Sequence, residues 1–118
     1  MIIEVKNYQS MRAAIGDLCD FLQSQKVSEN GLFHAKLVAS ELLGNVLLHS
    51  KASATLHGVL NNGFIELTVV SSVKYTPPEK SVRADVYAEH GRGLFLIDSV
   101  SVERWINETG DIVVKIEK

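Results

Sequence analysis

The chain has 118 residues, a formal net charge of −2 and 46% hydrophobic residues, which suits one soluble domain with a real core. The near-neutral charge and the absence of a run of Lys and Arg argue against binding to nucleic acid or to an anionic membrane surface. The apolar stretches read as too short and interrupted to span a bilayer, and the N-terminus lacks the pattern of a secretory signal. With a single cysteine, these features predict a cytoplasmic protein.

The first half of the chain alternates between a strand and two helices. A strand is predicted over residues 2–6, and a helix over about residues 11–25 with Ser10 as its N-cap. Residues 26–28 form a linker. Ser28 is expected to cap a second helix of about twenty residues that runs through HAKLVASELLGNVLLHS.

The second half is rich in strands. Residues 52–60 and 64–70 are predicted to pair through the turn Asn61-Asn62-Gly63, because Asn and Gly tolerate positive φ. Residues 71–90 hold both prolines without sustained periodicity, which predicts a long functional or mobile loop. A short helix is then predicted to begin in the segment GRGLFLIDSV. VERWINE and DIVVKIEK form a closing hairpin about a Thr109-Gly110 turn.

This order of elements favours an α+β fold. We expect a single domain over residues 1–118, built as a two-layer sandwich. Its sheet would be mixed and mostly antiparallel, with the helices on one face and the other face solvated or used for contacts. Trp105 is expected to pack from a strand onto a helix, and His57 to face solvent from its strand.

Glu41, Asn45 and His49 follow one another at intervals of four within ELLGNVLLHS. Positions four apart lie on nearly the same side of an α-helix, so the three form a polar stripe along the second helix. Leu42 and Val46 on the other side can pack on the sheet. Because burying an unpaired carboxylate is costly, the stripe should face water, a ligand or a partner. An ordinary solvent-facing stripe would show the same pattern.

A second motif lies in AEHGRGLFLIDSV, where Gly91 and Gly93 fall at the point at which the long loop becomes a helix. Glycines there let backbone N–H groups approach a phosphate, and a helix N-terminus adds a favourable dipole. A simple loop-to-helix turn explains a lone G-x-G equally well. Its combination with the polar stripe, the hairpin and the long loop is more specific.

Taken together, these motifs resemble the histidine-kinase-like ATPase superfamily, which includes gyrase, sensor histidine kinases and the small bacterial anti-sigma-factor serine kinases. The chain is most similar to the last group. The resemblance covers nearly the whole chain: an N box E-x3-N-x3-H, a hairpin, a lid loop, a second glycine box and a final hairpin. The ending after Thr109-Gly110 is similar to the G-T-x-V-x-L of the family. The resemblance implies the Bergerat-type ATP-binding fold.

The resemblance also implies roles for single residues. Glu41 matches the N-box glutamate, which acts as a base or orients the attacking hydroxyl. Asn45 matches the magnesium-binding asparagine, whose oxygen suits a hard cation. His49 matches a less strict histidine of the same box. The second glycine box, whose backbone lines the phosphates, corresponds to Gly91, Arg92, Gly93 and Leu94.

The family's first glycine box, D-x-G-x-G, is missing. Ser71 or Ser72 stands in place of the aspartate that accepts a hydrogen bond from adenine, and Val73 and Tyr75 stand in place of the glycines. Losing a hydrogen bond to a charged acceptor removes roughly 1.5–3 kcal/mol, which weakens binding about tenfold to a hundredfold. Asp85 is an alternative acceptor. ATP binding in a modified form, another ligand, and loss of nucleotide binding all stay open.

Two hypotheses follow from the resemblance. In the first, the chain binds ATP and Mg²⁺ as a regulatory domain and phosphorylates a serine on a small antagonist protein in bacterial transcription control, as a homodimer that also binds a sigma factor. In the second, the same fold has lost ATP binding and serves as a non-catalytic protein-interaction module. The intact N box favours the first, and the missing first glycine box favours the second.

Overall fold

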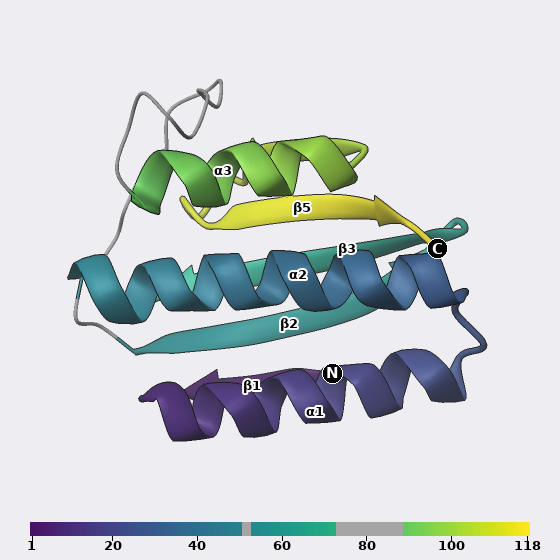
Figure 1. The fold of residues 1–118 in the computed structure, drawn as a ribbon, viewed down its shortest axis with the longest axis horizontal. Helices are drawn as coiled ribbons and strands as arrows, with labels where there is room; N and C mark the ends of the chain where they lie inside the picture. Colours follow the sequence, from purple (N-terminus) through teal and green to yellow (C-terminus); the bar gives the residue numbers. More distant parts are fainter. Residues whose placement is uncertain (51–52, 73–88) are drawn as a thin grey trace.

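The structure is a computed structural model that describes residues 1–50, 53–72 and 89–118 (Figure 1). Most of the predicted loop, with Val73, Tyr75 and Asp85, lies outside the described residues. The elements in chain order are β1 (Ile2–Val5), α1 (Tyr8–Ser24), α2 (Glu29–Asn45), a π-helical turn (Val46–Ser50), β2 (Ala54–Asn61), β3 (Phe64–Ser71), α3 (Glu89–Val100), β4 (Glu103–Ile106) and β5 (Ile112–Glu117).

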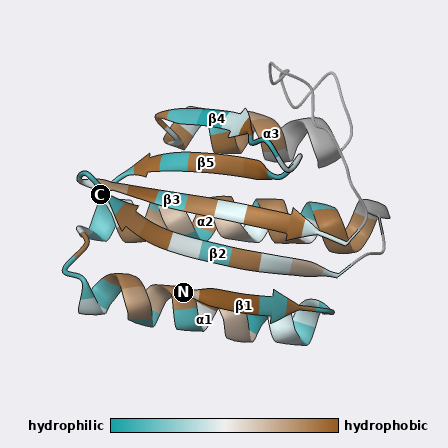
Figure 2. Cartoon of the chain, turned by 180° about the vertical axis from the view of Figure 1, so that it is seen from behind, coloured by the Kyte–Doolittle hydropathy of each residue, from teal (hydrophilic) through white to brown (hydrophobic). Residues whose placement is uncertain are grey.

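In the described part of the chain, five strands form one sheet in the order β1-β2-β3-β5-β4. All four described strand pairs are antiparallel, so the mixed sheet that we expected has no parallel pair among them. The three helices lie on one face of the sheet (Figure 1), and the opposite face carries none of them (Figure 2). The fold is therefore an α+β sandwich of two layers, as predicted.

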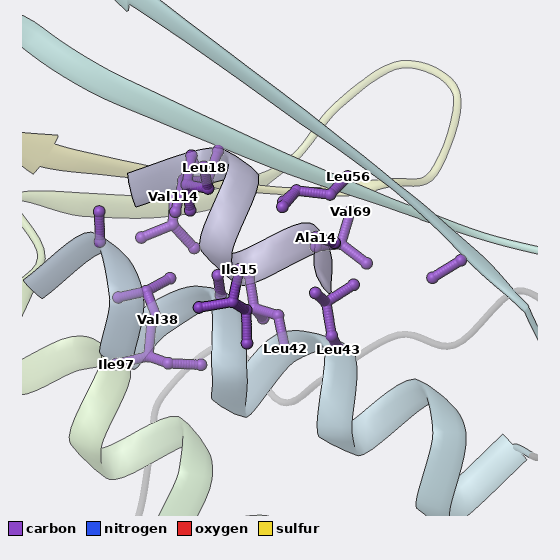
Figure 3. Close-up of a cluster of buried hydrophobic side chains, with 14 of the residues drawn as sticks. Ala14, Ile15, Leu18, Val38, Leu42, Leu43, Leu56, Val69, Ile97 and Val114 are labelled. Carbon is purple, nitrogen blue, oxygen red and sulfur yellow. The ribbon is translucent and has the colours of Figure 1, made fainter. Parts of the chain in front are cut away.

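Strand register decides which side chains face the helices. Ile65 lies opposite Ile116 and Leu67 opposite Val114, and all four side chains are buried. Directly paired residues share one face of a sheet, so these pairs form the floor of the core. Helices and strands both contribute to this core (Figure 3), through Ala14, Ile15, Leu18, Val38, Leu42, Leu43, Leu56, Val69, Ile97 and Val114.

The start of α1 differs from the prediction. Asn7, not Ser10, is the N-cap: its Oδ1 accepts a hydrogen bond from the Ser10 backbone N–H at 2.8 Å. The Ser10 Oγ in turn accepts from the Asn7 backbone N–H at 3.0 Å. This reciprocal pair is a capping box, so Ser10 is its second member and the helix begins three residues earlier than expected.

The β2–β3 hairpin confirms the turn prediction. Asn61 pairs with Phe64, which leaves Asn62 and Gly63 as a two-residue loop. Their φ values are 53° and 82°, in the left-handed region that only Gly and Asn adopt readily. The turn therefore fixes the register of the two central strands.

Helix α2 is the central helix, between α1 and α3 (Figure 1). As predicted, Ser28 is its N-cap, with Oγ accepting from the Gly31 N–H at 3.0 Å. Gly31 is buried, and a Cβ there would lie 2.9 Å from the backbone carbon of Lys118 and 2.9 Å from Val27 Cγ1. Glycine thus allows the first turn of α2 to pack directly on the end of β5.

The stretch Glu29–Leu48 corrects one expectation from the sequence. It is 20 residues long and apolar enough to cross a membrane by length and composition. Its buried positions, however, such as Val38, Leu42 and Leu43, contact the sheet and the other helices in the core. A helix that contributes to a core passes the same test of length and composition, so that test alone does not assign a membrane span.

We expect Gly31→Ala to destabilise the protein by about 1–3 kcal/mol, because the added methyl group must displace backbone atoms. Gly44→Ala, in the same helix, is the matched control, since nothing lies within 4 Å of its added Cβ. The control should be neutral or stabilise by up to about 1 kcal/mol. Urea unfolding of both variants measures this. Equal stability of the two variants would contradict the close approach at Gly31.

Candidate functional site

One end of the sandwich brings together the segments that the sequence singled out. The C-terminal end of α2, the first turn of α3 and the last residues of β3 all lie there, at the left of Figure 1. The β4–β5 turn lies at the same end (Figure 2). The two motifs, far apart in the sequence, therefore belong to the same region of the molecule.

Glu41 and Asn45 lie on the flank of α2 that is turned towards α3. On the other flank, Lys36 and Ser40 line an open groove of about 620 Å³ between α1 and α2. Because each residue advances an α-helix by roughly 100°, Glu41 and Asn45 fall on the opposite side of the buried Leu42. Figure 1 shows α3 beside that side of α2.

Both polar side chains are half-buried. No hydrogen bond or ion pair joins either of them to the part of the chain that the structure describes. Nor does that part contain any buried side-chain nitrogen or oxygen without a partner, so both groups reach solvent. A carboxylate and a carboxamide one helical turn apart therefore face solvent and are not engaged by described neighbours, which is compatible with a ligand site and equally with an ordinary solvent-facing stripe.

The third member of the stripe is placed differently. The α-helix ends at Asn45 and continues as the π-helical turn Val46–Ser50, which contains His49. The Val46 N–H bonds to both Leu42 O and Leu43 O where the winding changes. A π turn has more than four residues, so the four-residue spacing no longer keeps His49 in line with Asn45. The side chain of His49 lies outside the described residues.

The second glycine box lies inside α3 and not before it. The helix begins at Glu89, so Gly91 falls in its first turn and Gly93 in the next. Only the first few N–H groups of a helix lack an intrahelical acceptor. Gly91 can therefore still offer its N–H to a phosphate, whereas Gly93 and Leu94 belong to the hydrogen-bonded body of the helix. The Leu94 side chain is 1% exposed and belongs to the core, and that of Arg92 is not described.

Strand β3 distinguishes the two candidate serines. Ser71 pairs with Ala54, which is buried on the helix side, so Ser71 lies on the face that the helices cover. Ser72 is exposed, and its Oγ accepts a hydrogen bond from the Ser53 N–H at 3.1 Å. Of the two serines, Ser71 is therefore the one on the helix side of the sheet.

An ion pair that sequence reasoning missed holds α3 against the sheet. Arg104 Nε donates to Asp98 Oδ1 at 2.8 Å, and its Nη2 donates to Asp98 Oδ2 at 3.0 Å. The Arg104 side chain is 8% exposed. A two-point pair of this kind fixes orientation as well as distance, so it positions the helix that carries the second glycine box. Asp98 lies on a helix and Arg104 on the strand after the next turn, and no regular sequence spacing predicts a contact between two such residues. The sequence therefore contains no signal for this ion pair.

Within the described part of the chain, no three or more His, Cys, Asp or Glu side chains gather where they could hold a metal ion. Magnesium, however, is commonly held by one or two protein oxygens together with substrate phosphates. Asn45 and Glu41 fit that limited role.

No protein-family model matches the chain, and no curated protein matches it. The roles assigned to Glu41, Asn45 and the glycine box therefore stay predictions. What the fold contributes is their location at one end of a two-layer sandwich.

Asp98→Ala should lower the free energy of unfolding by about 2–4 kcal/mol, because it leaves the Arg104 guanidinium buried without this partner. Glu4→Ala is the matched control. It breaks the Lys6–Glu4 pair, whose side chains are 70% and 61% exposed, and should change stability by less than about 1 kcal/mol. Both are measured by urea unfolding, and a neutral Asp98→Ala would show that the pair does not hold α3.

Proposed function

We propose that the protein is an ATP-binding regulatory domain that resembles an anti-sigma-factor serine kinase and acts on a protein partner. The observation that carries this proposal is the free carboxylate and carboxamide pair, Glu41 and Asn45, on the flank of α2 beside α3. It is supported by the two-layer fold and by Gly91, whose position in the first turn of α3 suits a phosphate.

In this proposal Asn45 holds a magnesium ion through its side-chain oxygen, together with the nucleotide phosphates. The ion would neutralise charge on the transferred phosphoryl group. Glu41 then accepts the proton of the attacking serine hydroxyl or orients that hydroxyl. Both residues lie on one rigid, buried helix, so the spacing between base and metal ligand is fixed by the core.

The proposed adenine end of the site has less support from the residues present than the phosphate end. Ser71 offers a neutral hydroxyl where the family has a carboxylate, so a hydrogen bond to the adenine amino group would lose its charged acceptor. This substitution favours the second candidate function, a non-catalytic interaction module of the same fold. Under either function we propose a cytoplasmic protein that works through a protein partner, such as a sigma factor or its antagonist, and that forms a homodimer.

Calorimetric titration with ATP tests the proposal. We expect binding that requires Mg²⁺ and that Asn45→Ala weakens about tenfold to a hundredfold, because the metal loses its protein ligand. Ser40→Ala is the matched control: it lies on the other flank of α2, and its hydroxyl bonds only to Lys36 O at 2.8 Å among the described residues. Absence of binding at millimolar ATP would leave the interaction module as the function.

Ser71→Asp should restore the missing adenine contact. If Ser71 faces the adenine, a carboxylate there should strengthen ATP binding about tenfold to a hundredfold by supplying a charged acceptor. GTP, which carries a carbonyl in place of the amino group, should gain nothing. Ser72→Asp serves as the control, because Ser72 is tied to Ser53 at the strand end. An equal gain for both nucleotides, or for both variants, would place the adenine elsewhere.

A further inference from the structure

The face of the sheet opposite the helices carries a continuous row of side chains across all five strands. Each member lies directly opposite the next in the strand register. Paired residues point to the same face, and these positions alternate with those that face the helices. In the order β1-β2-β3-β5-β4, the row consists of Ile2, His57, Thr68, Val113 and Trp105.

This row contains no carboxylate and no ammonium group, and its two ends are apolar. Ile2 is 69% exposed at one edge of the sheet. Trp105, at the other edge, is half-exposed and lies on this open face. The sequence-based prediction that Trp105 packs against a helix was therefore wrong. None of the described helices covers the row (Figure 2). Accessible apolar side chains such as Ile2 and Trp105 at the two ends of the row are typical of a protein interaction surface, while Val113 between them is 6% exposed.

One side of the row is acidic. In the next row along the strands, Glu66 and Glu103 lie on either side of Lys115. No ion pair joins either carboxylate to a described residue. Lys115 places its Nζ 4.2 Å from the centroid of the Phe64 ring, so its charge is held over that ring. Exposed Glu117 adds a further carboxylate on the same side.

The exposed charges on the other side of the row are balanced, because Glu4 forms an ion pair with Lys6 at 3.2 Å. Asp111 also falls on that side by the alternation along β5, but it is 6% exposed and its Oδ2 accepts a hydrogen bond from Thr109 Oγ1. The face is therefore an uncharged band with an acidic border along one side only. Its complement is a surface with an apolar stripe that carries cations along one side.

We infer that this face binds an amphipathic helix of a partner protein, with its apolar stripe on the row from Ile2 to Trp105 and Lys or Arg side chains over Glu66 and Glu103. Neighbouring strands lie about 4.8 Å apart, so five strands span roughly 19 Å, the length of about 13 helical residues. A helix about 10 Å wide covers the row and reaches the next row, roughly 7 Å away along the strands.

Other occupants fit this charge pattern less well. A nucleic acid or an anionic membrane would bring phosphates against the carboxylate border, which repels them. A second copy of the chain would present either its own acidic border or its balanced side to Glu66 and Glu103. Neither side supplies the cations that these carboxylates would attract. This inference is independent of the proposed nucleotide site, which would lie in the helix layer beside α3.

Fluorescence tests the inference directly, because Trp105 is the only tryptophan of the chain. The probe is a synthetic 14-residue peptide of Leu and Lys, with leucines at helical spacing and lysines beside them. We expect a saturable shift of the Trp105 emission to shorter wavelength as the peptide covers the ring. A peptide with Glu in place of Lys should produce no shift.

Matched variants separate this surface from general charge attraction. E66K/E103K should weaken peptide binding at least about tenfold, because attraction becomes repulsion at two positions. D17K/D20K makes the same change in net charge on exposed residues of α1, in the other layer, and should leave binding within about twofold. Circular dichroism checks that both variants stay folded, and Ile2→Asp, which removes an apolar end of the row, should also weaken binding.

Several results would overturn the inference. One is the absence of a saturable emission shift, and another is equal weakening by the two charge-reversal variants. Binding of the Glu peptide as strong as that of the Lys peptide would also contradict it. A shift on concentrating the protein alone would assign the face to a second copy. The same shift with anionic vesicles or single-stranded DNA would assign it to that class of ligand instead.

Discussion

Helix α2 has to bury apolar surface on three neighbours at once: the sheet, α1 and α3. Its buried positions include Gly31 at the first turn, where a methyl group would meet the end of β5, and Leu43 near the last turn. An apolar helix of this kind is stable in water only when other elements cover its apolar side. The sheet, α1 and α3 together cover that side of α2, while Phe33 on the outer side is 65% exposed.

Because much of α2 is buried, the accessible polar side chains of Glu41 and Asn45 indicate where a ligand could reach this helix. On a helix that contacts the core through positions such as Leu42, Glu41 and Asn45 are left accessible on the flank beside α3, at the end of the molecule where α3 begins. The Asp98–Arg104 pair fixes α3 against the sheet and so fixes the other border of this region. The border on the sheet ends in Ser71, without a carboxylate. The proposed site thus has residues suited to phosphates and a magnesium ion but a neutral side chain at the proposed adenine end, which is why ATP binding is proposed together with a non-catalytic alternative.

Local chemistry made much of the fold predictable. The Asn62-Gly63 turn and the Ser28 cap are set by residues close in sequence, and alternation revealed the central strands. The cap of α1 was misassigned because Asn7 and Ser10 cap reciprocally, and either residue alone suits the position. The π turn after Asn45 and the ion pair between α3 and β4 depend on tertiary packing, which periodicity does not encode. Trp105 was assigned to the wrong face because a four-residue edge strand shows too little alternation to fix its orientation.

We propose that a nucleotide binds at the end of the sandwich where α2 finishes and α3 begins. Backbone amide shifts recorded by NMR during titration with ATP and Mg²⁺ test this proposal, because each amide reports its own position. We expect the shifted amides to cluster at Glu41 to Asn45, in the first turn of α3 and at Ser71, while those of the α1–α2 groove and of the open sheet face stay unchanged. Shifts confined to that groove or to the open face, or no shifts at millimolar ATP, would contradict it.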